Sequence, residues 1–328
     1  MTFSFSLEEL SDGASDVYRF MPATPQYAWP LLQENTGAKV WVKHENHTPT
    51  GAFKARGGFT YIKWLRQTYP DVRGIVTATR GNHGQSQALA ASLNGLKASI
   101  VVPRGNSPEK NAAMRAFGAE LIEFGDDFDE ARLEAMRLVE ENSYHMVPAF
   151  HEELVKGVAS YGLEFFKAVP DLDTVYVPIG CGSGVCSLIQ ARNALGLKTK
   201  IVGVVSTEAD AAKLSFEQGH LVETKSANTF ADGMAVRVPV RQAFEIYSSG
   251  MERVVAVSDY EIAEAVRIYY RCTHNLAEGA GAAALAALLQ EWELMKGKTA
   301  GVILTGGNID QSMMIDILNN KVPAVSQD

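Results

Sequence analysis

Short apolar runs alternate with longer stretches of helical periodicity along the chain. The apolar runs lie at residues 74–78, 98–103, 119–124, 174–179, 201–205 and 302–305. Continuous apolar runs of this length are typical of strands in parallel sheets, because helices cover both faces of such sheets. Between them, the clearest predicted helices are residues 85–94, 129–142 and 261–271. The pattern predicts an α/β protein with parallel sheets flanked by helices.

A capping box marks the start of the last predicted helix. Ser258 is followed three residues later by Glu261, and this spacing lets each side chain accept a hydrogen bond from a free amide at a helix start. No internal repeat or linker rich in proline, glycine and serine interrupts the chain. Composition alone therefore shows no domain boundary.

Glycine-rich or polar segments follow several of the apolar runs directly. Gly180-Cys181-Gly182-Ser183-Gly184 follows residues 174–179, and Thr79 to Gly84 follows residues 74–78. Backbone amides between a strand and a helix can close around an anion, and the helix N-terminus adds positive partial charge. The segment 180–184 therefore predicts a phosphate site, and residues 79–84 predict a place for a carboxylate. A dinucleotide fingerprint is a rival interpretation of residues 180–184, but its third glycine would fall on Ser187.

Lys54 is the candidate for covalent chemistry. It stands among small residues in the segment 50–58, directly after the aromatic Phe53. A lysine in a partly apolar pocket loses basicity and can form a Schiff base. A single lysine in such a turn is more often a surface residue, so this interpretation depends on the other motifs.

Together with Thr305-Gly306-Gly307-Asn308, these segments resemble, in the same order, the pyridoxal-phosphate enzymes of the tryptophan synthase β-like class, also called fold type II. Within that class they resemble the serine/threonine dehydratase (threonine ammonia-lyase) and serine racemase family, over residues from about 24 to 310. The resemblance implies a two-domain fold. A small domain at residues 74–149 would be inserted into a large cofactor-binding domain formed by residues 1–73 and 150–328.

The resemblance also implies functions for individual residues. Lys54 would hold pyridoxal 5′-phosphate as a Schiff base and act as the base, with Phe53 packed against the ring of the cofactor. The cofactor phosphate would lie on Gly180, Cys181, Gly182, Ser183 and Gly184, where Cys181 and Ser183 replace glycines of many relatives. Asn82 would approach the ring hydroxyl, and Glu278 and the loop 231–236 would line the cofactor pocket. The substrate carboxylate would be bound by Thr79, Arg80, Gly81, Asn82 and His83.

Thr305 resembles the hydroxyl residue beside the pyridine nitrogen in this family. A neutral hydroxyl does not force that nitrogen to be protonated, so the ring is a weaker electron sink. This favours prompt β-elimination over a long-lived carbanion. His83 is interpreted as an orienting hydrogen-bond group in preference to a general base.

Arg80 is the point where the chain departs from the pattern. Relatives that racemise serine carry a serine there as the acid/base opposite the lysine, and a permanently charged guanidinium is a poor substitute. Racemisation is therefore disfavoured. Two interpretations of Arg80 stay open: it holds an anionic part of the substrate, or it pairs with an acid at the surface.

The function predicted is β-elimination of a β-hydroxy amino acid, with L-threonine or L-serine as substrate, to give a 2-oxo acid and ammonia. The alternatives are a serine racemase, a dehydratase of a bulkier or acidic 3-hydroxy amino acid, and an anion-binding module without chemistry. Only about eighteen residues follow Asp310, so feedback regulation is not expected.

Composition excludes several other functions. The 328 residues carry 30 basic and 38 acidic side chains, a net charge of −8, without a basic block, which argues against nucleic acid as a partner. Residues 1–20 lack a signal pattern, and the apolar stretch 279–289 is too short to span a membrane. We expect a cytoplasmic homodimer that binds an amino acid substrate. The three cysteines, Cys181, Cys186 and Cys272, predict reduced thiols without a catalytic role.

No obligatory metal is expected. Some relatives bind a divalent cation through acids shortly after the strand that corresponds to residues 201–205. In this chain Val205 and Ala211 occupy two of those positions, and the nearby Glu208 and Asp210 need no metal to explain them.

Overall fold

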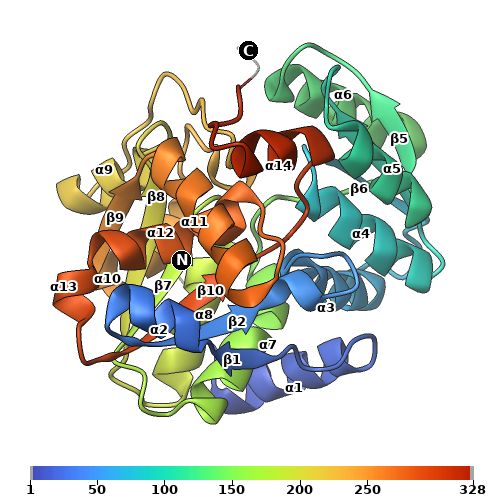
Figure 1. Cartoon of the computed structure of the whole chain (residues 1–328). Helices are drawn as coiled ribbons and strands as arrows, with labels where there is room; N and C mark the ends of the chain where they lie inside the picture. The colour runs from blue at the N-terminus through green and yellow to red at the C-terminus, as the bar shows by residue number, and fades with distance from the viewer. Residues whose placement is uncertain (1–2, 326–328) are drawn as a thin grey trace.

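The computed structural model describes residues 3–325 and contains two sheets (Figure 1). The six-stranded sheet has the order β1 (Gln26–Ala28), β2 (Lys39–His44), β10 (Thr299–Leu304), β7 (Thr174–Pro178), β8 (Lys200–Ser206) and β9 (Arg253–Val257). The four-stranded sheet has the order β5 (Glu120–Glu123), β4 (Lys97–Val102), β3 (Gly74–Ala78) and β6 (His145–Met146). Neighbouring strands are parallel, except that β1 runs antiparallel to β2.

Helices flank both sheets, which confirms the predicted fold class. They are α1 (Leu7–Tyr18), α2 (Pro30–Thr36), α3 (Lys54–Thr68), α4 (Asn82–Leu93), α5 (Pro108–Ala116), α6 (Phe128–Asn142), α7 (Glu152–Ala168), α8 (Ser183–Ala194), α9 (Ala211–Gln218), α10 (Arg241–Gly250), α11 (Asp259–Thr273), α12 (Gly279–Gln290), α13 (Trp292–Met295) and α14 (Gln311–Leu318). Two short 3-10 turns are η1 (Glu45–His47) and η2 (Asp232–Met234). In Figure 1, α4, α5 and α6 gather around the four-stranded sheet.

The predicted strands and helices are present, with shifts of a few residues at their ends. The capping box is confirmed as well: the Glu261 amide donates to Ser258 Oγ at 3.3 Å, and the Ser258 amide donates to Glu261 Oε2 at 2.7 Å. The sequence pattern did not predict β1, β2, β6 or β9. In β2 the reason is visible, because the buried Lys43 and His44 interrupt its apolar run.

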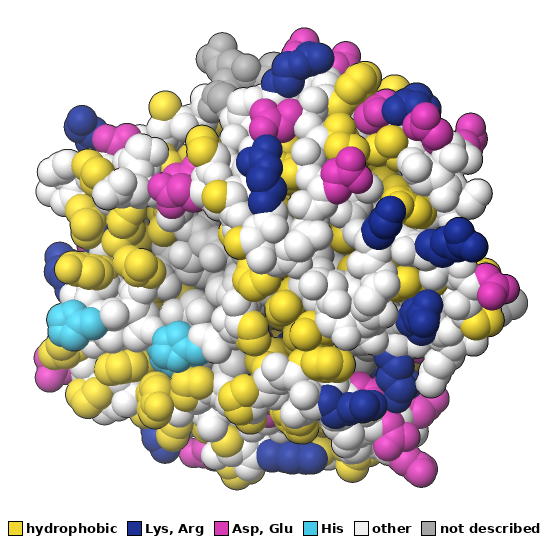
Figure 2. Space-filling model, turned by 90° about the vertical axis from the view of Figure 1, so that its right-hand side faces the viewer, with side chains coloured by type: hydrophobic (Ala, Val, Ile, Leu, Met, Phe, Trp, Pro, Cys, Tyr) yellow, Lys and Arg dark blue, Asp and Glu magenta, His cyan; other side chains and the backbone are white. Residues whose placement is uncertain are grey.

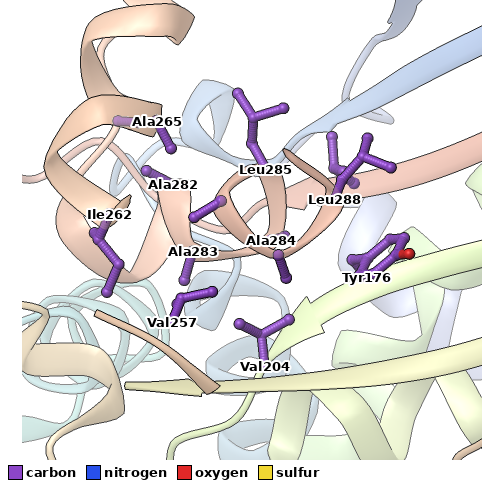
Figure 3. Packing of buried hydrophobic residues seen from close by; sticks show 14 of the residues in the cluster. Tyr176, Val204, Val257, Ile262, Ala265, Ala282, Ala283, Ala284, Leu285 and Leu288 are labelled. Atoms are coloured by element: carbon purple, nitrogen blue, oxygen red, sulfur yellow. The ribbon is translucent and has the colours of Figure 1, made fainter. Parts of the chain in front are cut away.

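Helix α12 forms the centre of the largest hydrophobic cluster (Figure 3). It consists mostly of alanine and leucine and is buried on nearly all sides, as expected for a helix that is apolar all round. Its alanines contact β8, β9 and α11, where Val204, Val257 and Ile262 lie. This packing fixes the position of Glu278, the residue directly before α12.

The strands of the four-stranded sheet all lie within the range predicted for the inserted domain. One hydrophobic cluster, however, combines Ile75 and Ile100 of that sheet with Phe59 and Leu65 of α3. Helix α3 therefore shares the hydrophobic core of the smaller sheet, where it packs against α4, although it precedes residue 74. The domain boundaries at residues 74 and 149 stay a prediction.

Figure 2 shows the face of the molecule that lies at the right of Figure 1. Basic and acidic side chains both occur across this face, with hydrophobic side chains between them. Among residues 3–325, no helix combines the length and the apolar character that crossing a membrane requires.

Candidate active site

Lys54 is the first residue of α3, and its backbone is held on two sides. The Phe53 amide donates to the carbonyl of Thr305 at 3.0 Å, and Ser86 Oγ donates to the carbonyl of Lys54 at 2.6 Å. The Lys54 side chain points toward the start of α8, where its Nζ lies 3.5 Å from Ser183 Oγ. The same Nζ lies 5.2 Å from the centre of the Phe53 ring.

The surroundings of Lys54 favour its neutral amine. Burial lowers the pKa of Lys54, and the charges of Cys181 and Glu278 offset only part of this effect. A neutral amine is the nucleophilic and proton-accepting form of lysine. The structure thus gives Lys54 the property that its predicted chemistry requires.

The loop between β7 and α8 requires glycine at two positions. Gly182 has a φ of 98°, in the left-handed region that favours glycine. A Cβ at Gly182 would collide with Ala243, and a Cβ at Gly180 would collide with the carbonyl of Gly233. Helix α8 begins at Ser183 without a side-chain cap, so its first amides are free to bind a phosphate.

Phe53 and Tyr161 close this loop from the side of α3 and α7. Their rings meet edge to face, with centres 6.2 Å apart. Tyr161 Oη donates to the carbonyl of Gly184 at 2.9 Å. A Cβ at Gly184 would lie 3.6 Å from the Phe53 ring, so the predicted aromatic neighbour of the cofactor does border the predicted phosphate loop.

The start of α4 also presents free amides, because the helix begins at Asn82 without a side-chain cap. The amide of the preceding residue, Gly81, donates to Thr79 Oγ1 at 3.1 Å. His83 is buried; burial and the charge of Lys54 lower its pKa to about 3. The imidazole is therefore neutral at physiological pH and a weak proton acceptor, which fits an orienting group better than a general base. Arg80 is half-buried in this segment.

Asn82 and Glu278 join the two sheets across the site. Asn82 Nδ2 donates to Glu278 Oε1 at 2.7 Å, and Asn308 Nδ2 donates to Asn82 Oδ1 at 2.8 Å. Burial raises the pKa of Glu278 to about 7, although Lys110 and Asn82 act in the opposite direction. Thr305 is buried directly after β10, and the Glu278 amide donates to the carbonyl of the next residue, Gly306, at 3.1 Å.

Lys110 is a residue of the site that the sequence pattern did not predict. It lies on α5, and its Nζ contacts Asp232 Oδ2 at 2.5 Å. Both residues line a small cavity with Glu278. Asp232 belongs to the predicted loop 231–236, but Lys110 carries no local signal, because a lysine on an amphipathic helix normally indicates a solvated face.

The donor set fits pyridoxal phosphate. The amine of Lys54, whose pKa is lowered, lies beside a loop that can bind a phosphate. The set also includes the side-chain amide of Asn82 and the hydroxyl of Thr305. Residues 18–306 match the family described as "Pyridoxal-phosphate dependent enzyme". The chain belongs to this family. Pyridoxal phosphate is accordingly its cofactor, as predicted.

Relatives and solved structures agree with this assignment. An L-threonine ammonia-lyase of Thermotoga maritima is 33% identical over 96% of this chain and 78% of its own length. A putative threonine dehydratase of Sinorhizobium fredii is 32% identical over 99% and 98%. Threonine deaminase isoform 2 of Solanum lycopersicum superimposes with a TM-score of 0.88 at 28% identity, covering 98% of this chain and 95% of its own. Maize serine racemase gives a TM-score of 0.89 at 25% identity, covering 97% and 98%.

These comparisons confirm the predicted resemblance to the dehydratase and racemase family and its fold type. The structure brings the predicted site residues together from five segments of the chain, near residues 54, 82, 182, 278 and 305. The roles of the individual residues stay predictions and are developed below.

Proposed function

We propose that this protein is a pyridoxal-phosphate-dependent ammonia-lyase that dehydrates a β-hydroxy amino acid, L-threonine or L-serine, to a 2-oxo acid and ammonia. The proposal rests on one observation above all. The amine of Lys54, whose pKa is lowered, lies 3.5 Å from Oγ of Ser183, the first residue of α8, and this helix start has no side-chain cap. The relatives named as threonine ammonia-lyases and dehydratases support the choice of reaction.

In this proposal Lys54 has two functions. Lys54 would hold the cofactor at Nζ. After the incoming amino acid has displaced Lys54 from the cofactor, the neutral lysine amine would accept the α-proton of the substrate. When bound, pyridoxal phosphate withdraws electrons from the α-carbon and so increases the acidity of that proton. The β-hydroxyl leaves as water, and hydrolysis of the remaining enamine takes up one water and releases ammonia.

The other residues bind and orient the substrate. The free amides at the start of α4 would bind the substrate carboxylate, while neutral His83 would add no charge there. Asn82, held by Glu278 and Asn308, would donate to or accept from the ring hydroxyl of the cofactor. Ser183 and the amides of residues 180–184 would bind the phosphate.

A panel of β-hydroxy amino acids tests the proposal. The release of 2-oxo acid would be measured with L-serine, L-threonine, 3-hydroxyaspartate and 3-phenylserine. Turnover of L-threonine or L-serine is expected. A preference for 3-hydroxyaspartate would instead support a substrate anion at Arg80, and no 2-oxo acid from any of the four would contradict a dehydratase.

The proposed assembly is a homodimer in the cytoplasm. A homodimer would sediment at twice the chain mass of 35.6 kDa. Sedimentation velocity of the cofactor-loaded protein tests this part, and a monomer would overturn it.

A further inference from the structure

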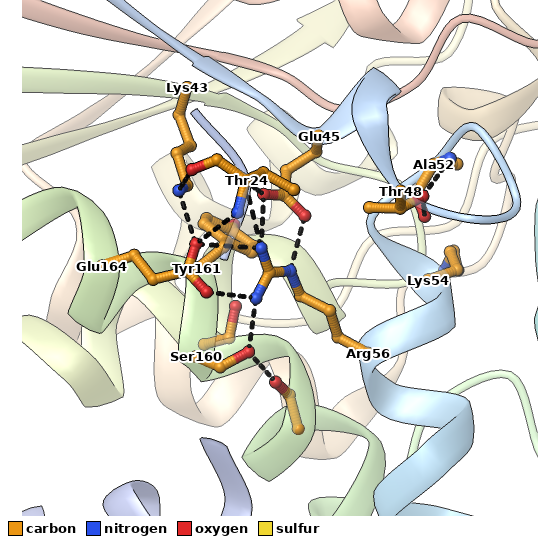
Figure 4. Close-up of polar contacts among 12 residues, drawn as sticks. Thr24, Lys43, Glu45, Thr48, Ala52, Lys54, Arg56, Ser160, Tyr161 and Glu164 are labelled. Atoms are coloured by element: carbon orange, nitrogen blue, oxygen red, sulfur yellow. Dashed lines mark hydrogen bonds and ion pairs between the residues drawn. The ribbon is translucent and has the colours of Figure 1, made fainter. Parts of the chain in front are cut away.

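A buried network of charged side chains lies behind α3, on the side away from the candidate active site (Figure 4). Residues two apart on a helix do not face the same direction, so Arg56 points into the interior while Lys54 points into the site. The Arg56 side chain is fully buried. Its Nε donates to Glu45 Oε2 at 2.7 Å, and one of its terminal nitrogens donates to Glu164 Oε1 at 2.6 Å.

Further polar groups complete this network. Lys43 Nζ contacts Glu164 Oε2 at 2.5 Å, and Thr24 Oγ1 donates to Glu45 Oε1 at 2.6 Å. Two cations and two carboxylates thus neutralise each other without solvent. Buried charges in such a network tolerate little displacement, because any broken contact leaves an uncompensated charge.

Helix α7 connects this network to the predicted phosphate loop. Ser160 and Glu164 of α7 both accept hydrogen bonds from Arg56. The residue after Ser160 is Tyr161, which donates to the carbonyl of Gly184 and contacts the ring of Phe53. Arg56 therefore holds α3, which carries Lys54, against the helix that supports residues 180–184.

The two helices also touch through their backbones. A Cβ at Gly57 would lie 2.7 Å from the carbonyl oxygen of Leu154 on α7. A Cβ at Gly157 would collide with the carbonyl of Arg56. The crossing of α3 and α7 is thus as close as two glycines permit, and Arg56 bonds to α7 directly beside it.

We propose that Arg56 is a positioning residue that sets the distance between Lys54 Nζ and the phosphate loop, residues 180–184. The short phosphate arm of pyridoxal phosphate confines its aldehyde and its phosphate to a narrow range of separations, so both ends bind together only if the distance from Lys54 Nζ to the loop falls within that range. Two attachments that act together strengthen binding far beyond either one alone. The inference rests on the proposed roles of Lys54 and the phosphate loop.

The test compares two ligands on the cofactor-free protein. Pyridoxal 5′-phosphate uses both attachments, whereas pyridoxine 5′-phosphate has no aldehyde and uses the phosphate loop alone. In the variant Arg56→Lys, the charge remains but the planar pair of hydrogen bonds is lost. We expect its affinity for pyridoxal phosphate to fall by about tenfold or more, and its affinity for pyridoxine phosphate to change by less than about threefold.

Lys43→Met is the matched control. It removes an ion pair to the same Glu164 but leaves Arg56 in place between α3 and α7. It is expected to lower the melting temperature without changing the ratio of the two affinities. Ser160→Ala removes one of the acceptors of Arg56 on α7 and provides the same measurement if Arg56→Lys does not fold.

The results distinguish a failure of the positioning role of Arg56 from a failure of the proposed function of the protein. An unchanged affinity ratio in Arg56→Lys or Ser160→Ala, or an equal change in Lys43→Met, would overturn the positioning role. If the unmodified protein bound both ligands equally well, Lys54 would not be the attachment, and the proposed function would itself be wrong.

Discussion

The side-chain amide of Asn82 donates a 2.7 Å hydrogen bond to Glu278, which links the start of α4 beside the smaller sheet to the start of α12 beside the larger one. Glu278 is buried at this position, and burial raises its pKa from 4.5 to about 7. The carboxyl therefore changes its charge close to physiological pH. This has a measurable effect on stability.

Glu278→Gln is expected to change how stability depends on pH. Between about pH 4.5 and pH 7 the folded protein keeps a proton on Glu278 that the unfolded chain has lost, so the free energy of unfolding decreases as the pH rises through this range. Glutamine keeps an acceptor for Asn82 and does not titrate. Relative to the parent, the variant should gain up to about 3 kcal/mol between pH 4.5 and pH 8. Urea unfolding of the cofactor-free proteins at both pH values measures this; an equal difference at the two values would contradict the assignment.

Lys54→Ala is expected to abolish turnover, because it removes both the attachment and the base. Borohydride reduction of the cofactor-loaded parent, followed by peptide mapping, identifies the lysine that carries the cofactor. Lys110→Ala is the comparison, since Lys110 is the other lysine beside Glu278. A label on Lys110 or on any lysine other than Lys54 would disprove the assignment.

Gly182→Asp is expected to lower the affinity for the cofactor by orders of magnitude, because Gly182 has a φ of 98° and a Cβ there would collide with Ala243, so the substitution deforms the predicted phosphate loop and adds a negative charge to it. Gly196→Asp is a matched control. Gly196 also has a positive φ, of 65°, but a Cβ there meets nothing within 4 Å. Equilibrium binding of pyridoxal phosphate to both folded variants measures the difference, and equal retention by both would exclude residues 180–184 as the phosphate site.

Arg80 is expected to prevent racemisation, because its guanidinium cannot serve as an acid/base opposite Lys54. L-Serine should therefore give pyruvate without appreciable D-serine, as measured by chiral analysis of the serine left after partial turnover. Substantial D-serine from the unmodified protein would favour a racemase. If Arg80 also contacts an anionic part of the substrate, Arg80→Ala should raise KM by about 10- to 100-fold, whereas unchanged kinetics would assign Arg80 to a surface ion pair.

Much of the fold and most of the candidate site could be predicted from local sequence. β3 and β7 are buried on both faces, so each forms an apolar run with a clear end, and the glycine-rich or polar segments that follow them mark the start of α4 and of α8. The small and aromatic neighbours of Lys54 are a local signal too, but its assignment depended on the order of the other motifs along the chain and on the family that they resemble.

The Arg56 network could not be predicted in this way. Glu164 lies 108 residues from Arg56 in sequence, and each charged residue of the network alone indicates a solvated surface. Only their mutual contacts make burial possible. The same reason explains the missed strand β2, in which Lys43 is buried because Glu164 neutralises it.

The position of β10 in the sheet has a consequence for the order in which the protein is built. This strand lies between β2 and β7, although most of the chain separates it from β2 in sequence. During synthesis, β2 and β7 therefore cannot be joined in the sheet until β10 has been made. Thr305, whose carbonyl accepts the hydrogen bond from the Phe53 amide, follows directly after β10. A nascent chain that already contains Lys54 and residues 180–184 still lacks one wall of the pocket, so cofactor attachment belongs to the last stage of folding.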